Sequence, residues 1–89
     1  MIPALALALG LGLAGTTASA APEPAELTFA EIERIALAEI PGGVVEDIER
    51  ETERGRIVFE VEVRDPDGFE YELIIDAHDG EVLAQKSDD

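Results

Sequence analysis

The spacing of the apolar residues changes once along this chain, and that change limits the folds available to it. Between residues 29 and 40 the apolar positions recur at helical spacing, and a Pro41-Gly42-Gly43 break follows. Beyond the break, apolar and polar residues alternate as in strands with one solvent-facing side, and three glycine-containing breaks divide this region. The sequence therefore predicts an α+β fold, in which one N-terminal helix packs on a four-stranded antiparallel β-meander (α-β-β-β-β).

The start of the predicted helix carries a capping signal. Thr28 precedes the helical stretch and Glu31 follows three residues later, which is the spacing of a capping box. The apolar side chains of the stretch project onto one helical face, which holds Phe29, Ile32, Ile35, Ala36 and Ile40. Glu39 projects onto the same face, and we expect its carboxylate to emerge at a frayed last turn.

The lengths of the loops fix which residues of neighbouring strands lie opposite each other. A two-residue loop at residues 54–55 sets Ile48 opposite Val61, and a three-residue loop at residues 66–68 sets Val61 opposite Leu73, with Gly68 in the left-handed region. The same register pairs Val63 with Tyr71 and Phe59 with Ile75. These loop lengths keep the apolar faces of the neighbouring strands in phase, which supports them.

Two further considerations complete the register. A two-residue loop at Asp67-Gly68 would place the apolar Val63 opposite Glu72. This loop length is therefore rejected. A four-residue loop at residues 77–80 sets Ile75 opposite Val82. The helix is then expected to meet a sheet face made of Ile48, Phe59, Val61, Leu73, Ile75 and Val82.

The opposite face of the predicted sheet offers a candidate docking surface. Ile74 and Leu83 are expected to lie opposite each other there, with Val58 diagonal to them. The surrounding positions are acidic, namely Glu60, Glu62, Glu70 and Glu72. These three apolar residues are either a surface for a protein partner or scattered surface residues that need no function. The outer strands, at residues 44–53 and 81–85, also expose backbone to which a partner's strand could pair.

The first part of the chain has the features of a signal peptide. Residues 1–20 are uncharged and largely apolar, and they end in Ala18-Ser19-Ala20, a pattern that a signal peptidase cleaves. The apolar run is short for a membrane-spanning helix, so a membrane anchor is the weaker alternative. The basic residue that usually begins a signal peptide is absent, which suggests a start upstream of Met1. We expect a signal peptide at 1–20, a mobile acidic Pro-rich linker at 21–26, a domain at 27–85 and a tail at 86–89.

The charge balance excludes several classes of partner. The chain carries 21 acidic and 6 basic residues, with a net charge of -15, and all of these lie after residue 20. Such a surface repels nucleic acid and anionic membranes, so a protein partner with a basic or neutral surface is expected. Without cysteine, the chain has no disulfide, thiolate nucleophile or Cys-type zinc site.

The sequence contains no catalytic constellation and assigns no catalytic, cofactor or metal residue. One histidine and few hydroxyl groups follow residue 20, so we expect a protein that is not an enzyme. Asp76, His78 and Asp79 share one predicted turn and could bind a divalent ion weakly, but Asp and Gly are also the residues that tight turns require, so we interpret the cluster as a turn. The Asp65-Pro66-Asp67-Gly68 stretch lacks the spacing of a calcium loop. Weak divalent-ion binding by an acidic envelope protein without a specific partner remains the alternative function.

Several of these motifs together resemble the PepSY domain. They are the Thr28-capped helix, the Pro41-Gly42-Gly43 stop, the Val61 to Gly68 hairpin and the closing Asp76-Ala77-His78-Asp79-Gly80-Glu81-Val82-Leu83. The resemblance covers residues 27 to about 84. It implies a non-catalytic module of a secreted or periplasmic protein that restrains or modulates a peptidase. On that basis we expect an exported binding module with a protein partner, such as a peptidase or another envelope protein, and no stable membrane anchor after cleavage.

Overall fold

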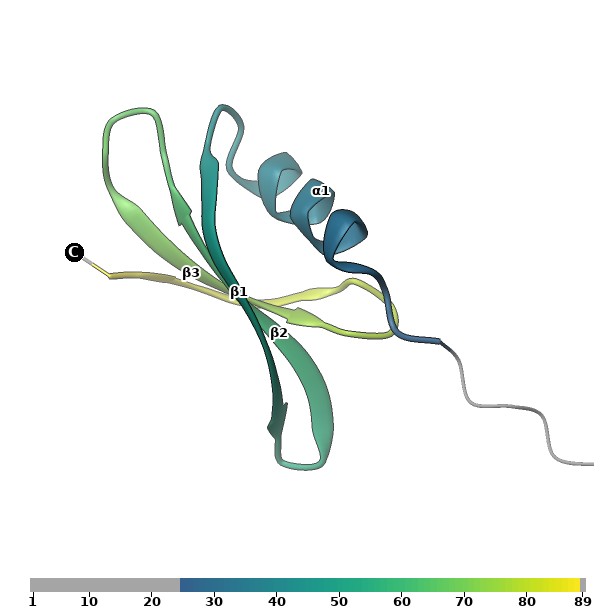
Figure 1. Ribbon diagram of the computed structural model, residues 1–89. Helices are drawn as coiled ribbons and strands as arrows, with labels where there is room; N and C mark the ends of the chain where they lie inside the picture. Colours follow the sequence, from purple (N-terminus) through teal and green to yellow (C-terminus); the bar gives the residue numbers. More distant parts are fainter. Residues whose placement is uncertain (1–24, 89) are drawn as a thin grey trace, which may run out of the picture.

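One helix followed by four antiparallel strands makes up the protein, as the sequence predicts (Figure 1). The computed structural model describes residues 25–88, and the expected signal peptide, residues 21–24 of the expected linker and Asp89 lie outside these residues. The elements are α1 (Phe29–Glu39), β1 (Val44–Glu53), β2 (Arg56–Arg64), β3 (Glu70–Asp76) and β4 (Val82–Ser87). The strands are hydrogen-bonded in their sequence order.

The first turn of α1 is fixed by the predicted capping box. The Thr28 hydroxyl accepts a hydrogen bond from the Glu31 amide at 3.1 Å, and the Glu31 carboxylate accepts one from the Thr28 amide at 2.9 Å. The helix ends at Glu39, one residue earlier than expected, because Ile40 leaves helical geometry while its amide still donates to the Ala36 carbonyl. Glu39 is exposed in this last turn, as expected.

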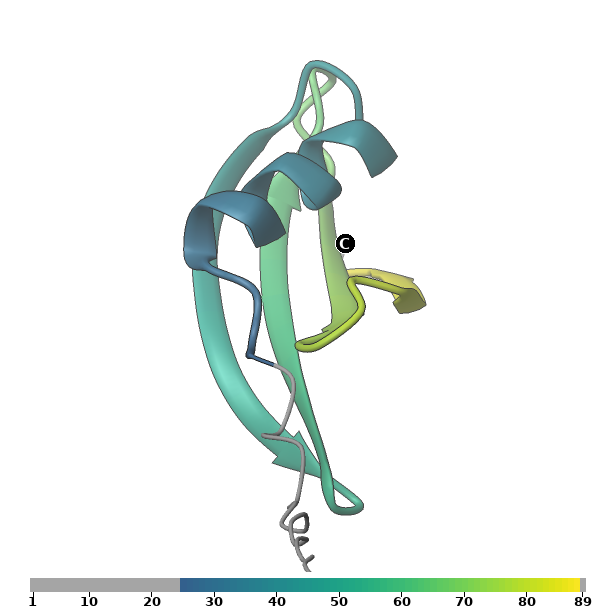
Figure 2. The same cartoon turned by 90° about the vertical axis from the view of Figure 1, so that its right-hand side faces the viewer.

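The core lies between α1 and one face of the sheet, with the helix lying across that face (Figure 2). Its buried side chains are Ile32, Ala36, Ile40, Phe59, Val61, Val63, Leu73, Ile75 and Ala77. Ile48 and Val82 are half-buried against it. Phe29, expected on the core face, is 59% exposed because it belongs to the first turn of the helix, at the rim of the core. Its ring still meets that of Phe59 edge to face, with 5.5 Å between centroids.

The predicted register is confirmed over most of the sheet. Ile48 lies opposite Val61, Val61 opposite Leu73, and Ile75 opposite Val82. The remaining predicted pairs, Val63 with Tyr71 and Phe59 with Ile75, are also observed. Gly68 has φ +92° in the three-residue loop, which is the left-handed conformation that this loop length requires.

The register between β3 and β4 differs from the expectation at one point. A bulge places Ile74 opposite Ala84 instead of Leu83, so the predicted pairing of Ile74 with Leu83 is wrong. The extra residue shifts the rest of β4 and brings Lys86 opposite Glu72, where the ammonium and carboxylate groups are 3.8 Å apart. The strand also continues to Ser87, two residues beyond the expected end of the domain.

The hairpin of β1 and β2 extends beyond the rest of the sheet (Figures 1 and 2). The ladder between β2 and β3 begins at Val58, whereas that between β1 and β2 reaches Arg56. Arg54 and Gly55 form the tip, and both have positive φ, at 52° and 79°. These values are typical of the two-residue turn that the sequence predicts.

Candidate functional site

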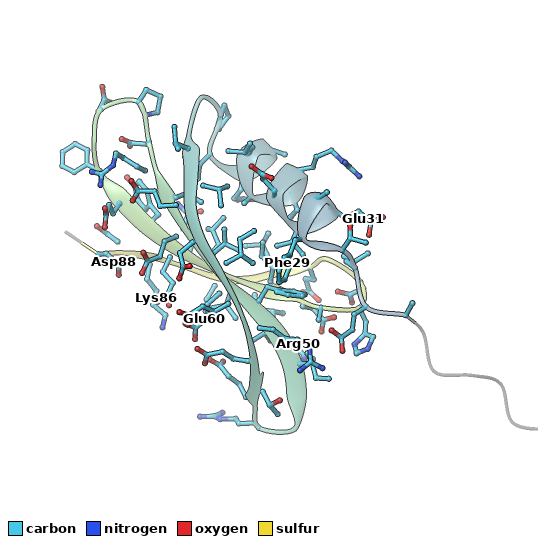
Figure 3. The ribbon with its side chains drawn as sticks, in the orientation of Figure 1. Phe29, Glu31, Arg50, Glu60, Lys86 and Asp88 are labelled. Atoms are coloured by element: carbon cyan, nitrogen blue, oxygen red, sulfur yellow. The ribbon has the colours of Figure 1, made fainter. Side chains whose placement is uncertain are left out.

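The sheet face opposite α1, called the far face here, has no helix on it within residues 25–88. In the sheet register, alternate residues of each strand belong to this face. Figure 3 shows Glu60 and Lys86 on this side of the sheet, and Phe29 and Arg50 on the other. The far face comprises Asp47, Glu49, Glu51 and Glu53 of β1, Arg56, Val58, Glu60, Glu62 and Arg64 of β2, Glu70, Glu72, Ile74 and Asp76 of β3, and Leu83, Ala84 and Lys86 of β4.

The three predicted docking residues do not form an exposed apolar patch. Val58 is 1% exposed and Ile74 is 5% exposed, while Leu83 is half-buried. Val58 lies opposite Glu51, and Ile74 lies opposite Glu60. Val58 and Ile74 therefore form a buried apolar floor of this face, with Glu51 and Glu60 as their cross-strand neighbours on it.

A hollow at one end of the far face brings two of the predicted residues together. Its volume is about 460 Å³, and its lining residues are Glu53, Arg54, Arg56, Val58 and Leu83. It therefore lies between the protruding hairpin and β4, and Ile74 lies outside it. The Arg56 guanidinium is 3.5 Å from the Asp76 carboxylate at this end.

Carboxylates lie directly opposite one another along the rest of the face. The register pairs Glu49 with Glu60, and Glu62 with both Asp47 and Glu72. Carboxylate oxygens of Glu49, Glu51 and Glu60 lie within 4.8 Å of one another. Because like charges directly opposite each other destabilise a sheet, this arrangement favours uptake of positive charge, either as protons or as an external cation.

The protonation of Glu60 responds to this environment. Burial of the carboxyl group, hydrogen bonding to Glu72, and the negative charges of Glu72 and Glu51 raise the pKa of Glu60 to about 7. The charge of Asp47 is the main cause that raises the pKa of Glu49. Near neutral pH the centre of the face is therefore partly protonated.

The two turns that the sequence singled out for metal binding are ordinary Asp-stabilised turns. Asp76 Oδ1 accepts hydrogen bonds from the amides of His78 at 2.8 Å and Asp79 at 3.0 Å. In the β2–β3 loop, Asp65 Oδ1 accepts from the amides of Asp67 and Phe69, both at 2.9 Å. These bonds support the interpretation of both motifs as turns.

Among residues 25–88, the group of three carboxylates whose oxygens all lie close enough to share an ion is Glu49, Glu51 and Glu60. Such a set of oxygens could bind a hard cation such as Ca²⁺. Sequence reasoning did not single out this trio. The predicted pairing of Ile48 with Val61 already implied that Glu49 lies opposite Glu60, and this register was the signal that could have found it.

The other expected features of the surface lie at the sheet edges and the linker. β1 and β4 are the edge strands, and β1 carries a bulge between Val45 and Asp47 that interrupts its regular pairing. Glu26, expected in a mobile linker, instead binds the Arg50 guanidinium through both carboxylate oxygens, at 2.8 and 2.7 Å. This ion pair and the bond from the Leu27 amide to the Ala77 carbonyl hold the segment before α1 on the sheet.

The described residues include no helix with the length and apolar character needed to cross a membrane.

Comparison with protein families gives one match to this fold. The family model described as PepSY, "Peptidase propeptide and YPEB domain", matches residues 26–86, which is more than half of the chain. No curated protein and no solved structure matches the chain. The matched range includes the helix, strands β1 to β3, β4 up to Lys86, and the far face.

Proposed function

The chain belongs to the PepSY family, and on that premise we propose that it is an exported, non-catalytic module that docks on a protein partner and modulates it. The partner is a peptidase or another envelope protein. The observation that carries this proposal is the family match over residues 26–86, because the family description names peptidase propeptides. A propeptide acts through its contact with the peptidase.

The proposed mechanism is steric occlusion. The module lies on its partner either through an edge strand, β1 or β4, or through the far face around Val58, Ile74 and Leu83. An edge strand can add to a partner's sheet through unpaired backbone groups. The far face offers the hollow beside Val58 and Leu83 as a place for a side chain of the partner.

The proposed location is the periplasm or the outside of the cell. The uncharged, apolar residues 1–20 with their Ala18-Ser19-Ala20 ending support export and cleavage. Sequencing the N-terminus of the protein purified from the culture supernatant or the periplasm tests this part. A mature protein that retains residues 1–20 contradicts it.

An inhibition assay tests the peptidase role. The purified mature domain is titrated against thermolysin-like peptidases from its own source, and a saturable loss of peptidase activity is expected. Unchanged activity at saturating domain defeats the inhibitor role. An affinity pull-down from envelope extract then tests docking on a partner of another kind, and the absence of any specific partner contradicts docking altogether.

The carboxylates of Glu49, Glu51 and Glu60 favour a second candidate function. Their close approach supports weak divalent-ion binding by an acidic envelope protein that has no specific partner. Calorimetry with CaCl₂ separates the two functions. Heat of binding together with an empty pull-down supports the ion-binding function, and a silent titration removes it.

A further inference from the structure

The far face and the core face of the sheet differ in what they can still bind. On the core face, Val61, Leu73 and Ile75 are fully buried beneath α1 and its neighbours. The far face carries no helix within the described chain. Its apolar floor at Val58 and Ile74 is already covered, so a partner gains little there by apolar contact alone. Recognition on this face must use the carboxylates and the hollow.

The carboxylates of this face follow the strands in rows. Asp47, Glu49, Glu51 and Glu53 occupy alternate positions of β1, and Glu60 and Glu62 occupy alternate positions of β2. Alternate residues of a strand are separated by roughly 6.5 to 7 Å. An extended segment of another protein has this same repeat, so basic side chains at every second position of such a segment can each meet a carboxylate.

The hollow adds a second recognition element that does not depend on the acidic rows. Val58 contributes to its lining and lies opposite Glu51. On the far face, this pair is the next one after Glu49 and Glu60 toward the hairpin tip, and the hollow begins there. Leu83, the bulge residue of β4, supplies a half-buried apolar wall. Arg54, Arg56 and Glu53 also line the hollow, and the Arg56 guanidinium lies 3.5 Å from the Asp76 carboxylate, so the apolar part of this end is the surface of Val58 and Leu83.

Charge complementarity identifies the occupant. With 21 acidic and 6 basic residues in the chain, the far face attracts a basic segment and repels an acidic one. We propose that the far face binds an extended segment of a partner protein, which places an apolar side chain in the hollow beside Val58 and Leu83 and basic side chains at alternate positions along the carboxylate row of β1, over Glu51, Glu49 and Asp47, with Glu60 of β2 beside Glu49. This inference rests on the proposed docking function and identifies the surface and the chemistry of the partner.

Peptide binding to the mature protein tests the inference. The probe is a fluorescent peptide, Leu-Thr-Lys-Thr-Lys-Thr-Lys, measured by anisotropy at low and at physiological salt. We expect saturable binding that weakens with salt. A peptide of the same composition that keeps the N-terminal leucine but has its lysines adjacent should bind about tenfold more weakly, because its lysines do not match the spacing of the carboxylate row. Equal affinity for the two peptides overturns the proposal.

Paired variants locate the binding surface. Glu49→Gln with Glu60→Gln should weaken the alternating peptide about tenfold, and Leu83→Ala should weaken it without changing its salt dependence. Glu33→Gln with Glu39→Gln removes the same charge from exposed positions of α1 and should have little effect. Thermal unfolding of each variant confirms that it folds. If the two charge pairs act equally, attraction by overall charge replaces the proposed surface.

The outcomes separate this inference from the proposed function. If the domain inhibits a peptidase or captures a partner but does not bind the alternating peptide, the inference fails and the docking function stands. If the peptide binds but no partner is captured and no peptidase is inhibited, the docking function fails instead. If CaCl₂ alone binds at Glu49 and Glu60 and the peptide does not, the face is an ion site and the inference is overturned.

Discussion

Glu49 of β1 lies directly opposite Glu60 of β2, at the centre of the sheet face that carries no helix. Folding brings these two acids together, and Glu72 and Glu51 add to the negative charge around Glu60. The pKa of Glu60 rises from 4.5 to about 7 through burial, the hydrogen bond with Glu72 and these charges. The folded state therefore binds more protons than the unfolded state between these two pH values. Stability is highest below the unfolded pKa and is lost as the pH rises through the folded pKa.

The pH dependence of this pair gives a first prediction. Thermal unfolding followed by circular dichroism should show a melting temperature that falls between pH 5 and pH 8. The corresponding loss in the free energy of unfolding is roughly 1 kcal/mol, because solvent screens the charges. Glu60→Gln should raise the melting temperature at pH 8 and flatten this slope. Glu33→Gln, on the exposed side of α1, should leave the slope unchanged. A parent protein whose stability is constant over this range contradicts the role of Glu60.

At acidic pH, the stability of the protein changes with pH in the opposite direction, and this gives a second prediction. Hydrogen bonds from the amides of Asp79 and His78 lower the pKa of Asp76, and those from Thr28 lower the pKa of Glu31. A carboxyl group with a lowered folded pKa stabilises the protein above its unfolded pKa, and this contribution is lost as the pH falls through the folded pKa. Stability should therefore decrease below about pH 4. Asp76→Asn should shift this acid transition, and an unchanged transition would contradict the assignment.

Two glycines near different turns provide a third prediction. A Cβ on Gly43 would lie 2.7 Å from Val63 Cγ1 and 2.9 Å from the Ile40 carbonyl oxygen, whereas a Cβ on Gly55 would meet nothing within 4 Å. Gly43→Ala should therefore cost about 1 to 3 kcal/mol through overpacking between the end of α1 and β2. Gly55→Ala, at φ +79°, should cost about 1 kcal/mol through backbone strain alone. Urea unfolding of both variants measures the difference, and an equal or smaller loss for Gly43→Ala contradicts the close approach.

The capping box provides a fourth prediction. Thr28→Ala removes the acceptor of the Glu31 amide and should lower the free energy of unfolding by about 1 kcal/mol. Thr28→Ser keeps the hydroxyl group and should retain most of the stability. Urea denaturation of the two variants and the parent protein checks this. If alanine and serine are equivalent at this position, the hydroxyl does not cap the helix.

The sequence was sufficient to predict the order of the elements and most of the register, because both depend on local rules. Loop lengths and alternation alone placed Ile48 opposite Val61 and Val61 opposite Leu73. The sequence did not predict the bulge at Leu83, which shifts β4 so that Lys86 lies opposite Glu72. A one-residue insertion of this kind leaves little trace in an alternating pattern of only six residues.

The candidate site was harder to predict than the fold. Alternation correctly assigned Val58 and Ile74 to the face without a helix, but it does not report burial by neighbouring side chains. Val58 and Ile74 are buried although no helix lies on their face, and their cross-strand neighbours include Glu51 and Glu60. Their exposure depends on the conformations of those long side chains, and the hollow depends on the curvature of the sheet and on the bulge. Neither is a property of a single strand.

The excess of acidic residues gives the last prediction, which concerns salt. Ion pairs such as Arg50 with Glu26 are weakened by salt, whereas repulsion among unpaired carboxylates is relieved by it. Repulsion should prevail, because 6 basic residues cannot neutralise 21 acidic ones and because Glu49 lies opposite Glu60. The melting temperature at pH 8 should therefore rise between low and physiological NaCl, and less so in Glu49→Gln with Glu60→Gln. A melting temperature that stays constant or falls with NaCl shows that the ion pairs outweigh the repulsion and contradicts this account of the far face.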